Sequence, residues 1–211
     1  MIKIDNLTKT FEGRTIFSQL NLTFQKGKVY ALIGESGSGK TTLLNILANL
    51  ENFDEGEVLY DDKPINSIKS QDYFRNYLGY LFQNFGLLES QTIRENLDLG
   101  LVGQKLDRKE REKQQLEALD QVALTYLNLD QKIYTISGGE AQRVALAKVI
   151  LKNPPLILAD EPTVALDPNN ASEVMSLLLS LKDEKRIIII ATYNPSVWEQ
   201  ADRIIKLDDV N

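Results

Sequence analysis

The stretch that decides the fold reads Val29-Tyr30-Ala31-Leu32-Ile33-Gly34-Glu35-Ser36-Gly37-Ser38-Gly39-Lys40-Thr41. Its first five residues form a continuous hydrophobic run, which is typical of a strand covered on both faces. The glycine-rich part that follows is a turn signal, and leucines recur at helical spacing between Lys40 and Ala48. The sequence therefore predicts a buried strand, a glycine-rich turn and a helix in immediate succession.

Residues 34–41 match the pattern G-x-x-x-x-G-K-[ST] in the strand-to-helix context that this pattern requires. Lys40 is expected to reach the β- and γ-phosphates of a nucleotide, Thr41 to bind Mg²⁺ through its hydroxyl, and Thr42 to reach the α-phosphate. The alternative is a flexible turn with a surface lysine, which the flanking strand and helix disfavour. The backbone N–H groups expected to surround the phosphates belong to Gly34, Glu35, Ser36, Gly37, Ser38 and Gly39.

Two adjacent carboxylates end another apolar run, Leu156-Ile157-Leu158-Ala159-Asp160-Glu161. Asp160 is expected to hold Mg²⁺, directly or through water, and Glu161 to polarise the water that attacks the γ-phosphate. By themselves they could be acidic loop residues that close a strand. Beside a phosphate site, the catalytic interpretation is favoured.

The remaining pattern predicts an α/β fold with a mainly parallel sheet, an antiparallel β flank at the N-terminus and an inserted helical part. We expect one domain over 1–211, with 1–83 and 153–211 as its core and 84–152 as the helical part. The expected strands cover residues 2–7, 20–24, 29–33, 57–60, 78–82, 156–159, 186–191 and 203–207, and the expected helices cover 40–48, much of 92–151, and 169–181.

Composition excludes several classes of protein. The 211 residues contain no His and no Cys, so a Ser-His-Asp triad, an imidazole metal ligand, a disulfide framework and a cysteine nucleophile are all ruled out. A net charge of -6 argues against a nucleic-acid partner. No apolar run approaches the roughly 20 residues of a spanning helix, and no apolar signal sequence follows Met1, so we expect a cytoplasmic protein.

A second glycine-rich segment, Ser137-Gly138-Gly139-Glu140, precedes a helical pattern. The spacing of Ser137 and Glu140 is that of a capping box, which opens many helices. The two glycines between them also expose backbone amides that could hold a second anion. The cap alone and the anion site are both open interpretations of this segment.

Here the sequence resembles the ATP-binding cassette (ABC) ATPases along essentially its whole length. Residues 136–143, ISGGEAQR, are similar to the family signature LSGGEQQR. The resemblance implies a head-to-tail dimer that sandwiches two Mg·ATP, with Ser137, Gly138, Gly139 and Glu140 completing the site of the second copy. It also implies a P-loop NTPase core with a RecA-like sheet.

Three more residues take roles from this resemblance. Gln83 matches the glutamine that senses Mg²⁺ and the membrane partner, and Phe11 matches the aromatic residue that stacks on adenine, although core packing is the ordinary role of a lone Phe. Asp167 matches the loop that crosses the dimer interface. It could equally cap the helix that begins at Pro168, and both roles can hold together.

The helical insert has two notable segments. Residues 104–123 are highly charged, with opposite charges at 107/111 and 108/112, which predicts a solvated helix supported by ion pairs along it. Apolar residues follow Gln83, and the family docks its membrane subunit there; internal packing would explain about half of them. They are Phe85, Leu87, Leu88, Ile93, Leu97, Leu99 and Leu101.

Two segments late in the chain depart from the family pattern. Tyr193 and Asn194 stand in Ala191-Thr192-Tyr193-Asn194-Pro195 where the family has His and Asp, and Val164 replaces a small residue. A phenol can donate a hydrogen bond to a phosphoryl oxygen, but it carries no positive charge at neutral pH. We therefore expect a slow ATPase rather than a fast one.

Within the family the chain resembles the exporter branch of lipoprotein-release, macrolide and antimicrobial-peptide systems, and most closely the ATPases assigned to bacteriocin export of the lactococcin 972 group. This implies a separately encoded membrane permease as partner, with the chain peripheral on the inner face of the membrane. The alternatives are a nucleotide-gated regulatory protein with little turnover, which Tyr193 allows, and a soluble cassette acting on ribosomes or DNA, which the length and charge disfavour.

Overall fold

The computed structural model describes residues 1–164 and 166–209, so Ala165 and the last two residues lie outside the described part. The chain forms two compact units. The first comprises Met1–Leu78, Pro155–Glu161 and Lys182–Asn211, and the second comprises Gly79–Pro154 and Pro162–Leu181. Residues 162–181, which the sequence-based division counted with the core, thus group with the helical residues.

The first unit contains an antiparallel sheet in the order β2-β1-β4-β5. Its strands β1 and β2 run longer than the sequence predicted. Asn6 and Gln19 have positive φ, and the register between β1 and β2 shifts within this region, so the apolar alternation breaks although the pairing continues. The strands are β1 (Ile2–Phe11), β2 (Arg14–Phe24), β4 (Glu55–Tyr60) and β5 (Lys63–Pro64).

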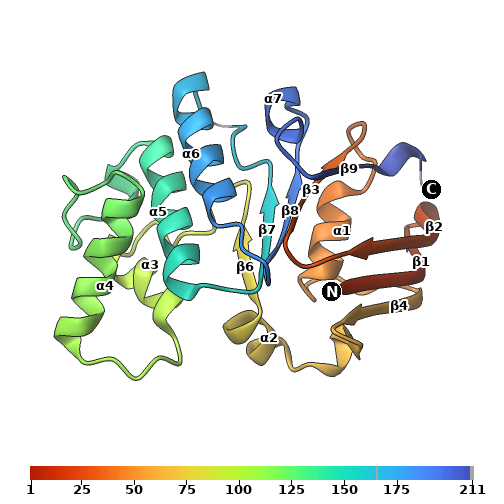
Figure 1. Cartoon of the computed structure of the whole chain (residues 1–211), viewed down its shortest axis with the longest axis horizontal. Coiled ribbons are helices and arrows are strands. Elements are labelled where there is room, and N and C mark those ends of the chain that lie inside the picture. The colour runs from red at the N-terminus through yellow and green to blue at the C-terminus, as the bar shows by residue number, and fades with distance from the viewer. Residues whose placement is uncertain (165, 210–211) are drawn as a thin grey trace. The chain divides into compact units, whose positions relative to one another are not determined.

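The same unit contains parallel strands in the order β7-β8-β3-β9 (Figure 1). Their burial agrees with their apolar sequences, since every residue of β7 and β8 is buried. The strands are β3 (Lys28–Ile33), β7 (Leu156–Asp160), β8 (Ile187–Ala191) and β9 (Arg203–Lys206). The strand β6 (Leu78–Leu81) begins at the last residue of this unit.

The described part of the first unit contains three α-helices, α1 (Lys40–Leu47), α2 (Ser70–Asn76) and α7 (Pro195–Trp198). Helix α1 packs on β7 and β8 and has the predicted bounds within one residue. The sequence did not predict α2, because it is short and has one fully buried side chain, Tyr73, rather than an apolar stripe. The Tyr73 hydroxyl donates a 2.8 Å hydrogen bond to the carbonyl of Leu47, at the end of α1.

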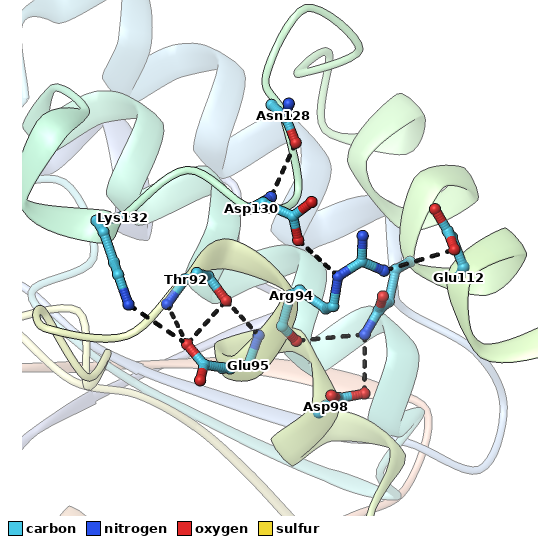
Figure 2. Close-up of polar contacts among 9 residues, drawn as sticks. Thr92, Arg94, Glu95, Asp98, Glu112, Asn128, Asp130 and Lys132 are labelled. Atoms are coloured by element: carbon cyan, nitrogen blue, oxygen red, sulfur yellow. Dashed lines mark hydrogen bonds and ion pairs between the residues drawn. The ribbon is translucent and has the colours of Figure 1, made fainter. Parts of the chain in front are cut away.

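The second unit is helical and contains α3 (Ile93–Asp98), α4 (Arg108–Gln121), α5 (Gly138–Lys152) and α6 (Pro168–Ser180). Polar contacts join its elements (Figure 2). Arg94 of α3 lies 2.9 Å from Asp130 and 3.6 Å from Glu112 of α4, and the Thr92 and Glu95 side chains form a capping box at the start of α3. Helix α6 contacts α5, which explains why residues 162–181 group with this unit.

The charges of α4 do not pair as the sequence predicted. Arg111 pairs with Asp98 of α3 at 3.1 Å, and Asp107 caps α4 by accepting a hydrogen bond from the Glu110 amide at 2.9 Å. Arg111 thus ties α4 to α3, while α4 is largely exposed and carries an ion pair along it between Lys113 and Glu117 at 3.7 Å, as predicted for a solvated helix. The prediction of pairs at 107/111 and 108/112 was wrong because neighbouring elements offer closer partners.

The apolar residues that follow Gln83 divide into three groups. Ile93, Leu97 and Leu101 are fully buried, so they build the core of the helical unit, whereas Phe85 and Leu87 are half-buried and Leu88 and Leu99 are exposed. Internal packing therefore explains the first group only. Among the described residues, no helix is long and apolar enough to cross a membrane.

The junction between β3 and α1 depends on a residue without a side chain. Gly39 has φ of 95°, in the left-handed region, and a Cβ there would lie 2.6 Å from both the Ile16 and Phe17 side chains of β2. Any other residue would have to adopt a strained backbone and push β2 away. Gly13, in the turn between β1 and β2, has a similar φ of 84° but nothing within 4 Å of its Cβ position.

We expect Gly39→Ala to lower the free energy of unfolding by at least about 2 kcal/mol, because strain and steric overlap add. Gly13→Ala is the matched control, since it introduces only the strain, and its expected loss is about 1 kcal/mol or less. Urea unfolding followed by circular dichroism measures both. Equal losses in the two variants would contradict the proposed contact with β2.

Candidate functional site

The loop 34–39 between β3 and α1 presents backbone amides. Inside the loop the Ser38 amide donates to the Glu35 carbonyl at 3.1 Å, and within the described residues no side chain caps the start of α1. The first N–H groups of a helix lack partners inside the helix and carry positive potential. The Ser38 hydroxyl oxygen is also buried, with no hydrogen-bond partner in the described part of the chain. This cradle fits the phosphates of a nucleotide.

Two side chains that the sequence analysis missed hold the cradle from its flanks. The Arg14 guanidinium donates to the Gly37 carbonyl at 3.5 Å, and the Asp208 carboxylate accepts from the Glu35 amide at 3.1 Å. Asp208 lies in a 3₁₀ helix directly after β9, the strand that pairs with β3. No motif marks either residue, because both contacts depend on which strands become neighbours.

Phe11 lies at the end of β1, where it pairs with Arg14 across the turn to β2. Its side chain is exposed, and the Lys9 ammonium lies 4.3 Å from the centre of its ring. Lys9 is itself buried and paired with Glu51 at 2.7 Å. The ring therefore has one face against a cation and remains accessible to a flat ligand, as stacking on adenine would require.

Lys40 is only 5% exposed, and its ammonium directly contacts three groups of the described residues. It donates to the carbonyls of Gly34 and Glu35 at 2.9 and 3.0 Å, and it lies 3.7 Å from the centre of the Tyr193 ring. The helix that begins at Lys40 and the strand that ends before Tyr193 thus bring together two residues that are far apart in the sequence.

Asp160 is the last residue of the buried strand β7 and Glu161 follows it, beside Lys40 and Thr41. The Asp160 carboxyl accepts a hydrogen bond from the Thr41 side chain, yet burial outweighs this bond and the nearby Lys40 charge and raises the pKa of Asp160. Burial also raises the pKa of Glu161, and the negative charge of Asp160 adds to the increase. The Tyr193 backbone N–H and the Thr192 side chain bond to the Glu161 carboxyl and oppose it.

The residues present also fit a divalent cation held together with phosphates. The Thr41 hydroxyl and the Asp160 carboxylate are hard oxygen ligands and lie in hydrogen-bond contact. One carboxylate oxygen of Glu161 is buried with no hydrogen-bond partner among the described residues, so it can accept a proton donor such as water. The described residues contain no group of three or more His, Cys, Asp and Glu placed to hold a metal.

In the second unit, the Ser137–Glu140 segment opens α5. Ser137 and Glu140 form the predicted capping box, and Glu140 also accepts a 2.8 Å hydrogen bond from the Tyr126 hydroxyl. These bonds lower the pKa of the Glu140 carboxyl, the backbone bond from Ser137 most of all. Gly138 is exposed, and a Cβ at Gly139 would lie 3.3 Å from the Asn170 side chain of α6.

Gln83 and Asp167 also belong to the second unit. Gln83 is exposed and follows β6 by two residues. Asp167 caps α6, whose first residue is Pro168, by accepting from the Asn169 and Asn170 amides at 3.1 and 3.2 Å. The predicted cap is thus confirmed. Hydrogen bonds from the Asn170 side chain and these amides lower the pKa of Asp167. Val164 is exposed in the turn before α6.

The first unit therefore gathers the cradle, Lys40, Thr41, Asp160, Glu161 and Tyr193 in one place. Thr192, which the sequence analysis did not single out, belongs with them. The signal in the sequence that could have identified Thr192 was its position directly after an apolar strand and beside Tyr193. Phe11 and Thr42 also lie in the first unit, and the second unit holds the other predicted residues in three segments of its own: Gln83, Ser137–Glu140 and Asp167.

Comparison with known proteins gives consistent matches. Lipoprotein-releasing system ATP-binding protein LolD of Treponema denticola is 38% identical over 218 residues, covering 98% of this chain and 95% of LolD. Macrolide export ATP-binding/permease protein MacB of Campylobacter jejuni is 33% identical over 99% of this chain, which spans 33% of MacB.

A solved structure matches closely as well. The ATP-binding cassette MJ0796 of Methanocaldococcus jannaschii, determined as a dimer in a post-hydrolysis state with ADP and Pi, has a TM-score of 0.89 and 35% identity over 98% of this chain and 94% of that chain. This confirms the predicted P-loop NTPase fold with its parallel and antiparallel sheets. The family model described as ABC transporter matches residues 17–164. The chain belongs to the ABC transporter family and is an ABC ATPase domain.

Proposed function

We propose that this ATPase domain dimerises around Mg·ATP and drives a separately encoded membrane permease. The observation that carries the proposal is the grouping of Lys40, Thr41, Asp160 and Glu161 at the end of the cradle. Lys40 and the cradle amides bind the phosphates. Thr41 and Asp160 hold the Mg²⁺, which neutralises charge on the phosphates when bound.

Glu161 is the proposed general base. Its pKa is raised by burial, so its carboxylate accepts a proton more readily than an exposed glutamate at the same pH. The Tyr193 amide and the Thr192 side chain fix one side of the carboxyl, and its other oxygen is buried without a hydrogen-bond partner among the described residues. This oxygen is the one that we assign to the attacking water.

The remaining roles are assigned by family resemblance. Phe11 stacks on adenine, and Gln83 responds to Mg²⁺ and to the membrane partner. Ser137–Glu140 and Asp167 act across the interface with a second copy of the chain. MJ0796 was solved as a dimer with ADP and Pi, which supports this arrangement. We propose no nucleic-acid partner for the chain.

The proposed partner is a permease that exports a peptide or bacteriocin, which would place the chain on the inner face of the cell membrane. The names of LolD and MacB, a lipoprotein-releasing and a macrolide-export protein, support an exporter. The cargo itself rests on the resemblance to bacteriocin-export ATPases. Purification of the chain together with the product of a neighbouring permease gene, and transport assays in vesicles, would test both points.

A second candidate function is nucleotide-gated regulation with little turnover. The observation that favours it is Tyr193, whose uncharged ring occupies the position of the family histidine and contacts Lys40. Tight ATP binding with phosphate release at background level would favour this candidate. Measurable turnover that depends on Glu161 would favour the transport ATPase.

We expect Lys40→Ala to abolish ATP binding measured by calorimetry, because the cradle loses its cation.

Glu161→Gln should retain binding, accumulate as the Mg·ATP dimer in size-exclusion chromatography, and release phosphate about 10²–10³ times more slowly. Tyr193→His should release phosphate faster than the unchanged protein. Glu184→Gln, an exposed glutamate, is the control with unchanged activity. A rate unaffected by Glu161→Gln would eliminate the proposed base.

We also expect Glu161→Gln to raise the melting temperature of the nucleotide-free protein at neutral pH. Because folding raises the pKa of this carboxyl, ionised Glu161 destabilises the folded state above that pKa. The penalty disappears as the pH falls through the folded pKa towards the unfolded value of about 4.3. The gain should therefore shrink between pH 7 and about 4 in scanning calorimetry. Glu184→Gln should follow the unchanged protein, and a gain that is constant with pH would contradict burial as the cause.

A further inference from the structure

Among the described residues, the Lys40 ammonium directly contacts two carbonyl oxygens and one aromatic ring, as many groups as it has protons. An ammonium group has three N–H donors. Two of them are directed to the Gly34 and Glu35 carbonyls at 2.9 and 3.0 Å, and the Tyr193 ring lies 3.7 Å from the nitrogen. A phosphate that binds Lys40 must therefore displace at least one of the three.

The backbone on both sides of the Tyr193 ring is held in place. The Thr192 amide donates to the Leu32 carbonyl of β3 at 3.1 Å, and the buried Thr192 hydroxyl accepts from the Asn194 amide at 3.0 Å. The Tyr193 amide bonds to the Glu161 carboxyl. These bonds hold the ring beside the cradle independently of the Tyr193 hydroxyl. The face of the ring, rather than its hydroxyl, lies against the Lys40 ammonium.

Of the three contacts, the ring is the easiest to displace. A hydrogen bond from an ammonium to a carbonyl is charge-assisted, and both of these bonds are short and part-buried, so breaking one of them is costly. A cation–π contact to a ring that is 48% exposed is weaker. The arriving phosphate therefore exchanges with the ring rather than with the carbonyls.

We propose that Tyr193 is a positioning residue whose ring face holds the Lys40 ammonium away from the nucleotide and so weakens nucleotide binding. This rests on the proposed function, in which Lys40 binds phosphate. The ring contact is expected to reduce ATP affinity by about two- to fivefold, the strength of a partly exposed cation–π pair. The histidine that the family has at this position lacks a phenol ring, so the proposed weakening of nucleotide binding is specific to the tyrosine of this chain.

The first measurement needs no nucleotide. In an NMR spectrum of the nucleotide-free protein, the ring should shift the Lys40 ε-methylene protons upfield, as a ring face does to any proton above it. Tyr193→Phe should keep the shift, and Tyr193→Leu should remove it. Saturating Mg·ATP should also remove it from the unchanged protein. Absence of the shift in the nucleotide-free protein would overturn the ring contact itself.

The second measurement is ATP affinity by calorimetry for the same variants. Tyr193→Leu should bind ATP about two to five times more tightly than the unchanged protein, and Tyr193→Phe, which keeps the ring face, should show no such gain. Tyr134→Leu, at another exposed tyrosine, is the matched control with unchanged affinity. Equal or weaker binding by Tyr193→Leu, or tighter binding by Tyr193→Phe, would overturn the proposal. If the shift is present but the unchanged protein binds no ATP, the proposed function fails and the ring contact stands alone.

Discussion

The structure of the site depends on one constraint, the reversal of the chain between β3 and α1 at a residue that can have no side chain. Gly39 adopts a left-handed conformation directly against Ile16 and Phe17 of β2. The antiparallel sheet can therefore pack against the loop, and α1 can begin at Lys40 with its first amides free of side-chain caps within the described residues. Arg14 and Asp208 then hold the loop from outside.

The parallel sheet determines the chemistry of this loop. Strands β3, β7 and β8 pair in parallel, so their carboxyl ends meet at one edge. At these ends lie the cradle, Asp160 with Glu161, and Thr192 with Tyr193. The same burial that makes the strands stable raises the pKa of both carboxyls, and their contacts with Thr41, Tyr193 and Thr192 only partly compensate. The site thus stores unfavourable charge that a cation and a proton donor can relieve.

The second unit uses the same physical device, a helix N-terminus, in a different way. Ser137 and Glu140 satisfy the first turn of α5, and Asp167 satisfies that of α6. Arg143 of α5 pairs with Glu173 of α6 at 2.8 Å, which fixes the two helices against each other. Both caps are thus satisfied within the helical unit itself.

The sequence by itself determined the elements whose signals are local. The cradle, the start of α1, the capping box at Ser137 and the apolar strands follow from residue type and spacing, because each is a property of neighbouring residues. Only the tertiary structure decided the partners of Arg14 and Asp208, the pairing of Arg111 with Asp98, and the contact of Lys40 with Tyr193. Those partners are far apart along the chain, and they meet because strand order and helix packing bring them together, which residue spacing cannot encode.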